Sequence, residues 1–364
     1  MSFPPLVING LSARVPIIQG GMGVGVSLSR LSSAVANAGG IGVISSAMIG
    51  IREADIFKDT VTANLRALRS EIAKAKEMAS QGIIGVNIMV ALSSFSEMVR
   101  TSIEAKADII FAGAGLPLDL PRHLLDLCEQ KQEEFKTRLV PIVSSARAAG
   151  IIAKKWMSRF GYLPDAFVVE GPEAGGHLGF KPEDLGSQDH NLDKLTSEVI
   201  QVAIALEDQV GKSVPVIAAG GVYNGADIKR LLSRGAAGVQ MGTRFVATYE
   251  CDASDKFKQA YIDARETEVT IIKSPVGMPG RALRNNFIDA VEKGLTKPFK
   301  CLFNCISSCQ RENAPYCIAT ALINAMNGNL EKGFAFCGSN AFRVKDIVSV
   351  NELISSLERE YDAA

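Results

Sequence analysis

The chain alternates short apolar segments with longer amphipathic ones from its start to about residue 241. The apolar segments are rich in Val, Ile and Ala and end in Gly or polar residues, a pattern typical of buried parallel strands. Eight strands are predicted, at residues 16–20, 40–46, 83–89, 108–113, 139–144, 166–170, 214–219 and 237–241. Helices are predicted between them, at residues 28–37, 59–79, 95–106, 123–136, 145–159, 195–210 and 226–234. Eight such βα units favour a closed α/β barrel, the TIM barrel.

An open, doubly wound sheet shows the same local alternation. That fold commonly carries G-x-G-x-x-G after its first strand, whereas residues 21–25 read GMGVG, and we therefore favour the barrel. We predict the barrel over residues 1–250. A smaller helical domain is expected at 251–302, over the barrel mouth, because residues 248–273 are charged and helical in pattern and 273–280 are rich in turn residues. A cysteine-rich extension, 303–364, would pack back on the barrel and end in a helix near 350–360.

Composition excludes several classes of protein. With 39 basic and 39 acidic side chains the chain has no net charge, so nucleic acid is not an expected partner. It shows no secretion signal and no apolar run long enough to span a membrane, which predicts a cytoplasmic protein. Seven cysteines, an odd number, make a disulfide framework unexpected.

Two consecutive strands end in small residues where barrels hold phosphate. Gly220 and Gly221 follow the seventh predicted strand, and Gly242 and Thr243 follow the eighth. Backbone N–H groups at such turns can point at an anion. Each turn alone would indicate only tight packing, but together they favour a phosphate-bearing cofactor.

The sixth predicted strand leads into a paired glycine and one of only three histidines, His177. Gly175 and Gly176 would let the backbone approach a flat ligand while the imidazole reaches over it. A histidine capping a turn is the alternative. We favour a reaction centre, because imidazole exchanges protons near neutral pH.

Six ordered segments carry a resemblance to a known family. Residues 16–23, 85–87, 170–177, 218–221 and 239–243 read PIIQGGMG, GVN, EGPEAGGH, AAGG and VQMGT, and residues 273–281 read KSPVGMPGR. Together they resemble the nitronate monooxygenase family, which includes the flavin-dependent enoyl-acyl carrier protein reductases of the bacterial type II kind. The resemblance implies a TIM barrel with a smaller helical domain, non-covalently bound FMN and one active-site histidine.

The same resemblance implies roles for individual residues. His177 matches the catalytic histidine, and Gly220, Gly221, Gly242 and Thr243 match residues that hold the FMN phosphate, with Gln240 and Met241 in the same loop. Met22 and Asn87 match positions around the flavin ring, and Glu170 and Gly175 match positions that contact the ribityl chain and ring. Gly21 and Gly176 lie in the same motifs and are expected to contact the cofactor. Many nitronate monooxygenases have glutamine where this chain has Glu170, and the reductases have glutamate.

Four cysteines, Cys301, Cys305, Cys309 and Cys317, crowd into one segment of the extension. Their spacing departs from zinc-ribbon and ferredoxin patterns, so we expect no metal. On a helix, the first three would share one face as buried thiols. A metal or iron–sulfur site at these four residues is the less favoured alternative.

The first hypothesis for function is an FMN-dependent oxidation of alkyl nitronates by O2, which gives a carbonyl compound and nitrite. The second is an NAD(P)H-dependent enoyl-thioester reductase, and the third is a flavin- or thiol-based redox sensor. Either enzyme would take a small-molecule substrate, and a homodimer is an open alternative to a monomer.

Overall fold

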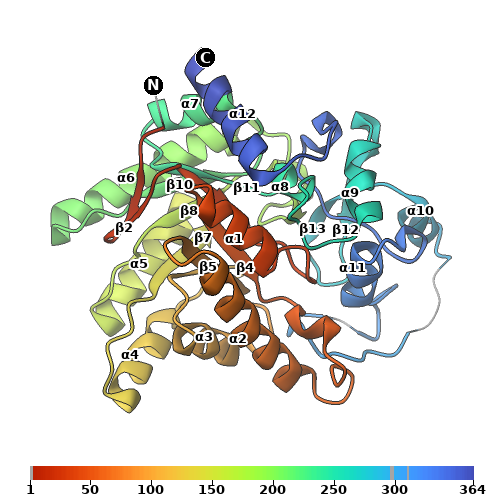
Figure 1. The fold of residues 1–364 in the computed structure, drawn as a ribbon, viewed down its shortest axis with the longest axis horizontal. Helices are drawn as coiled ribbons and strands as arrows, with labels where there is room; N and C mark the ends of the chain where they lie inside the picture. The colour runs from red at the N-terminus through yellow and green to blue at the C-terminus, as the bar shows by residue number, and fades with distance from the viewer. Residues whose placement is uncertain (1–2, 296–298, 310) are drawn as a thin grey trace.

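The computed structural model describes residues 3–295, 299–309 and 311–364. Its centre is a closed barrel in which eight parallel strands pair in the order β10-β11-β3-β4-β5-β6-β7-β8. This confirms the predicted TIM barrel (Figure 1). The strands are β3 (Ile17–Gln19), β4 (Ile41–Ser45), β5 (Ile83–Met89), β6 (Ile109–Gly113), β7 (Arg138–Val143), β8 (Phe167–Glu170), β10 (Val216–Ala219) and β11 (Gly238–Met241).

Helices follow the barrel strands and cover the outside of the barrel (Figure 1). They are α1 (Ser29–Asn37), α2 (Thr60–Met78), α3 (Phe95–Glu104), α4 (Leu120–Lys131), α5 (Ala146–Phe160), α6 (Leu192–Val210), α7 (Gly225–Ser233) and α8 (Thr243–Val246). Several begin at a side-chain cap, as where Asp59 accepts a hydrogen bond from the backbone N–H of Thr62. Helix α4 lies about four residues earlier than predicted, since Pro121 starts its first turn and Gln132 ends it in the left-handed conformation.

A β-hairpin closes the N-terminal end of the barrel. Strands β1 (Leu6–Ile8) and β2 (Leu11–Ala13) pair antiparallel, and their side chains join the apolar cluster inside the barrel. Leu6 and Ile8 are fully buried there, against residues such as Phe111. The opposite end, where the barrel strands terminate, is the end at which TIM barrels have their active sites.

The accessory region beside the mouth contains strands as well as helices. Its helices are α9 (Asp255–Ile262), α10 (Asn286–Glu292) and α11 (Ile318–Met326). Strands β12 (Val269–Lys273) and β13 (Pro279–Leu283) form a hairpin, and β13 also pairs with the short β9 (Gly176–His177). The helix predicted over 248–273 is therefore wrong at its C-terminal end, where a β-branched run suits a strand better.

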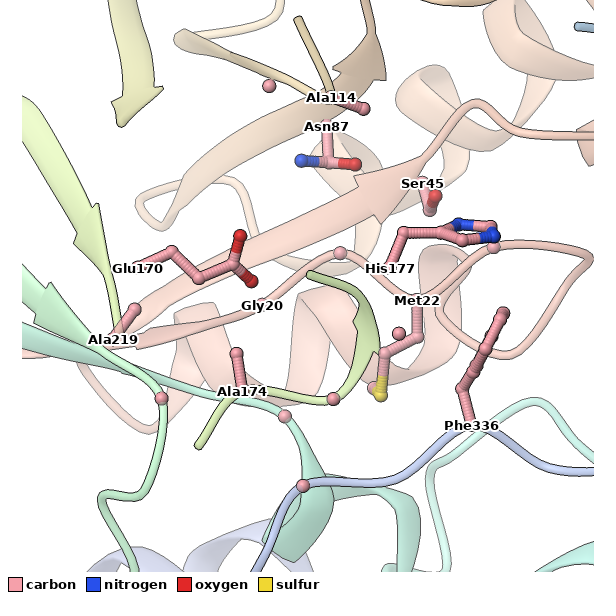
Figure 2. Close-up of a pocket in the computed structure, with 18 of the residues that line it drawn as sticks. Gly20, Met22, Ser45, Asn87, Ala114, Glu170, Ala174, His177, Ala219 and Phe336 are labelled. Atoms are coloured by element: carbon pink, nitrogen blue, oxygen red, sulfur yellow. The ribbon is translucent and has the colours of Figure 1, made fainter. Parts of the chain in front are cut away.

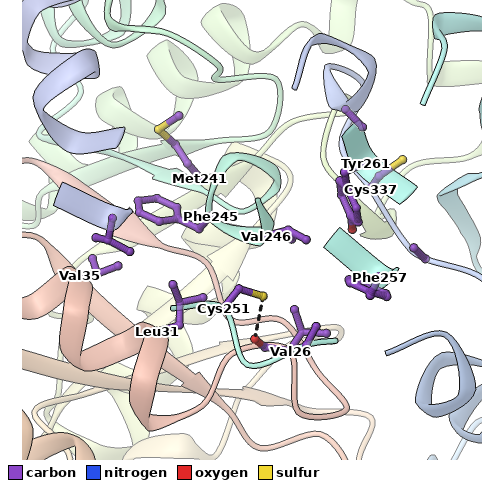
Figure 3. Close-up of a cluster of buried hydrophobic side chains, with 14 of the residues drawn as sticks. Val26, Leu31, Val35, Met241, Phe245, Val246, Cys251, Phe257, Tyr261 and Cys337 are labelled. Atoms are coloured by element: carbon purple, nitrogen blue, oxygen red, sulfur yellow. Dashed lines mark hydrogen bonds between the residues drawn. The ribbon is translucent and has the colours of Figure 1, made fainter. Parts of the chain in front are cut away.

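This region shares a core with the barrel. Figure 3 shows Val26, Leu31 and Phe245 packed close to Cys251, whose thiol lies 3.5 Å from the Val26 carbonyl oxygen. Cys337, from the C-terminal extension, belongs to the same cluster. The division into 1–250, 251–302 and 303–364 stays a prediction.

The chain ends in α12 (Val350–Ala363), which packs on α7 and α1. Short 3-10 turns lie at Ile49–Arg52, Pro182–Asp184, Gln188–His190, Glu266–Glu268, Leu330–Lys332 and Ala341–Arg343. Among the described residues, no helix combines the length and the apolar character that a membrane span requires.

Candidate active site

A cavity of about 520 Å³ opens at the carboxyl-terminal mouth of the barrel. Every residue for which the sequence predicted a catalytic or cofactor contact lines it. These residues are Gly21, Met22, Asn87, Glu170, Gly175, Gly176, His177, Gly220, Gly221, Gln240, Met241, Gly242 and Thr243. The structure therefore brings the predicted site together, and the roles of its members stay predictions.

His177 lies on β9 at the edge of the accessory sheet and faces this cavity (Figure 2). Its Nε2 atom is 2.7 Å from the hydroxyl oxygen of Ser274, a buried residue of the β12–β13 hairpin. Phe336 meets the imidazole edge to face, with ring centroids 4.9 Å apart. Burial lowers the pKa of His177 to about 4, so the ring is neutral at pH 7.

Glu170 lies at the end of β8 with its carboxyl directed into the cavity (Figure 2). It is partly buried, and no hydrogen bond or ion pair joins it to another described residue. Burial without a cationic partner raises the pKa of this carboxyl to about 7. Glu170, rather than His177, is therefore the group that changes charge near neutral pH.

Asn87 and Gly21 form a close contact on one wall of the cavity. A Cβ atom added at Gly21 would lie 2.3 Å from the Cβ of Asn87, closer than two carbon atoms can approach. Only glycine allows the chain after β3 to pass beside the Asn87 side chain. The backbone at Gly21 and the Asn87 side chain thus form one continuous part of the cavity wall.

The predicted phosphate end has left-handed glycines at the tip of β10. Gly220 and Gly221 have φ values of 91° and 87°, which L-residues rarely adopt, and Gly242 follows β11 beside them. Backbone N–H groups at turns of this kind can bind a phosphate. One acidic side chain lies close by, since Glu173 packs over Gly221 and accepts a hydrogen bond from Ser339.

The C-terminal extension completes this end of the cavity. The Gly338 N–H donates to the hydroxyl of Thr243 at 3.0 Å, and the amide of Asn340 donates to the Gly221 carbonyl at 2.8 Å. The sequence predicts residues 338–341 only as part of the C-terminal extension. The motif GSNA was the available signal, but nothing local showed which strand end it would meet.

Buried Arg281 fixes the loop that carries His177. Its guanidinium donates to the carbonyl oxygens of Pro172 and Ala174, at 2.7 and 2.6 Å. These two carbonyls lie between Glu170 and His177, so Arg281 holds the two titratable groups in a fixed relation. The sequence motif contained this arginine but did not indicate its role.

The outer wall of the cavity is apolar. Leu92, Leu116, Ile306, Ile318 and Leu322 contribute to it, from barrel loops and from the C-terminal extension. No lysine or arginine is among the described residues that line the cavity. Against this outer wall, away from the glycine turns, a neutral and partly apolar group is therefore favoured over an anionic one.

The four clustered cysteines are all free thiols. Residues 301–309 form no helix, so the predicted shared helical face is wrong. Instead the segment pairs with the loop after β5, where Ser93 N–H donates to the Cys305 carbonyl. No group of three or more His, Cys, Asp or Glu among the described residues is arranged to hold a metal ion. Cys305 does line the cavity, and burial raises the pKa of its thiol to about 11.

A TIM barrel that gathers a partly buried imidazole and carboxyl at the carboxyl ends of its strands has the arrangement typical of the active site of a TIM-barrel enzyme. Residues 6–360 of the chain match the family model described as nitronate monooxygenase. The chain belongs to the nitronate monooxygenase family.

Several relatives are similar over most of the chain. A (3aS,4S,5R,7aS)-5-hydroxy-7a-methyl-1-oxo-octahydro-1H-indene-4-carboxyl-CoA dehydrogenase of Mycobacterium tuberculosis is 29% identical over 77% of this chain, and the match spans 66% of that protein, slightly under two thirds. A probable nitronate monooxygenase of Staphylococcus aureus (strain JH9) is 26% identical over 78% of this chain and 79% of its own length. The structure of FabK from Thermotoga maritima superposes with a TM-score of 0.70 at 26% identity, over 96% of this chain and 94% of that one.

Proposed function

We propose that the chain binds FMN at this cavity and reduces a neutral, conjugated acyl thioester with electrons from NAD(P)H. The observation that carries the proposal is the charge of the cavity, which has carboxyls and a neutral imidazole but no cationic lining residue. An anionic nitronate would be desolvated there without a counter-charge. A thioester brings an uncharged reacting group, and its acyl chain fits the apolar outer wall.

FMN, when bound, would supply the hydride transfer. Gly220, Gly221, Gly242 and Thr243 would hold its phosphate, and the Gly21–Asn87 wall would face its ring. The overall reaction takes one hydride from NAD(P)H and one proton from solvent, and it saturates the carbon–carbon double bond.

His177 would act here as a neutral hydrogen-bond donor. Its Nδ1 atom has no partner among the described residues. If the Ser274 hydroxyl donates to Nε2, the ring proton lies on Nδ1 and can bind the thioester carbonyl oxygen, where negative charge develops. Ser274 thus selects the tautomer, and a pKa of about 4 keeps the ring from ionising.

The relatives support this substrate class and a second one. The dehydrogenase relative acts on a CoA thioester by its name, whereas other relatives are named as probable nitronate monooxygenases. Oxidation of alkyl nitronates is our second candidate. Glu170 favours it, because a carboxyl with a pKa near 7 can still donate a hydrogen bond to an anionic oxygen below that pH.

A flavin-reduction experiment without oxygen tests both candidates. The flavin-loaded protein is mixed with NADH, NADPH or an alkyl nitronate, and absorbance near the flavin maximum is followed. We expect a reduced nucleotide to bleach the flavin and crotonyl thioester to restore it, while His177→Ala slows reoxidation. Bleaching by nitronate alone would instead establish the second candidate, and purified protein without flavin would refute both.

A further inference from the structure

Two arginines lie over the ring of one tyrosine at the predicted phosphate end of the cavity. The Arg244 guanidinium carbon lies 4.6 Å from the Tyr223 ring centroid, and that of Arg343 lies 4.1 Å from it. Tyr223 follows the Gly220–Gly221 turn and lines the cavity. We call these three residues the arginine–tyrosine stack.

Neither arginine has an acidic partner. Within the described parts of the chain, no carboxylate oxygen lies within 4 Å of either guanidinium. Arg244 donates to the Tyr223 carbonyl at 2.9 Å, and Arg343 donates to the Asn340 side chain at 3.3 Å. A guanidinium has five N–H donors, so most remain available at each arginine.

The neighbouring carboxylates are already hydrogen-bonded elsewhere. Glu360 accepts from the Gly225 N–H at 2.8 Å, and Glu173 accepts from Ser339 at 3.0 Å. Neither carboxylate forms an ion pair with the stack, and both cations lie beside a cavity that has no cation among its described lining residues. Stacking on an aromatic ring also fixes the planes of both guanidiniums, which favours two-point recognition of phosphate.

We propose that the arginine–tyrosine stack binds a phosphate on the nucleotide tail of a diffusible cosubstrate, the adenosine phosphate that NADPH and CoA thioesters share. The inference rests on the proposed function only in taking the cavity as the site of redox chemistry. Backbone N–H groups at the glycine turns already fit the phosphate of FMN. The stack lies next to that turn, where Asn340 bridges Gly221 and Arg343, and so offers a separate anion site.

Calorimetric titration of the flavin-loaded protein tests the site directly. The probes are adenosine 2′,5′-bisphosphate, which represents NADPH, adenosine 3′,5′-bisphosphate, which represents CoA, and adenosine without phosphate. Arg343→Ala is the main variant, because this side chain is exposed. Arg244→Met retains the packing on Tyr223 without the charge. Arg159→Ala removes an exposed arginine at the C-terminal end of α5, which is not part of the stack, and serves as the control.

We expect one bisphosphate to bind the wild-type protein more tightly than adenosine does, and which one it is identifies the cosubstrate. Arg343→Ala and Arg244→Met should each weaken that affinity about tenfold or more, as expected for loss of a charged hydrogen bond. The flavin content and the Arg159→Ala affinity should not change. Equal binding of adenosine and both bisphosphates would overturn the proposal, and so would unaltered affinity in both variants. Loss of flavin with unaltered nucleotide affinity would assign the stack to the FMN phosphate instead.

Discussion

Replacing Glu170 by glutamine should stabilise the flavin-free protein above neutral pH. The folded protein raises the pKa of this carboxyl from 4.5 to about 7, because the charged form is buried without a partner. Between these two values the folded state holds a proton that the unfolded state has lost. Stability therefore falls as pH rises from about 4.5 to 7 and stays lower above 7.

The size of the effect follows from the same two values. Each pH unit between them corresponds to about 1.4 kcal/mol, so the ionised carboxyl lowers the free energy of unfolding by about 3 kcal/mol above pH 7. Glutamine has nearly the same shape and no charge to bury. Glu170→Gln should thus equal the wild type at pH 4.5 and exceed it by about 3 kcal/mol at pH 8.

Urea unfolding of both proteins from pH 4.5 to 8.5, followed by circular dichroism, measures this difference. Exposed Glu207 on α6 provides the matched control, since Glu207→Gln removes the same charge in solvent. The control should follow the wild type across the whole range. A difference between Glu170→Gln and wild type that does not vary with pH would refute the reasoning, because the carboxyl would then have its ordinary pKa.

Three further substitutions test the geometry of the site. Ser274→Ala should leave the His177 Nε2 atom without a partner, which lowers turnover about tenfold and the free energy of unfolding by about 1–3 kcal/mol. Ser274→Thr should recover both, and full activity of Ser274→Ala at every pH would contradict the prediction. Gly21→Val should abolish most flavin binding, read as the absorbance ratio of purified protein, because its Cβ would collide with Asn87; normal flavin content would show that the wall can move. Arg281→Met should lower the free energy of unfolding, measured in urea, by about 2–4 kcal/mol. A loss smaller than about 1 kcal/mol would mean that the loop before His177 keeps its conformation without this arginine.

The barrel could be predicted because each βα unit is encoded locally. Apolar runs of strand length and helices with caps recur along the chain, and the parallel arrangement follows from the crossover helices. The accessory region could not be predicted in the same way. Strand β12 follows directly on a charged segment that is helical in pattern. Its hairpin partner β13 pairs in turn with β9, which is only two residues long and lies about a hundred residues earlier.

The glycines that follow the barrel strands could be predicted as cavity residues for a related reason. In a parallel barrel all strand ends meet at one mouth, so residues directly after strands become neighbours without any knowledge of packing. Ser274, Asn340 and Arg281 reach the same mouth from elements outside the barrel. Their approach depends on tertiary contacts that no local pattern records.

The charge states of His177 and Glu170 show why residue type alone does not assign a chemical role. From their ordinary pKa values, histidine is the group expected to exchange protons near pH 7 and glutamate is expected to be ionised. Enclosure in one cavity reverses this order, because it disfavours the charged form of both: it lowers the pKa of His177 to about 4 and raises that of Glu170 to about 7. A pH dependence of activity centred near 7 should therefore disappear in Glu170→Gln and persist in any variant that leaves this carboxyl in place.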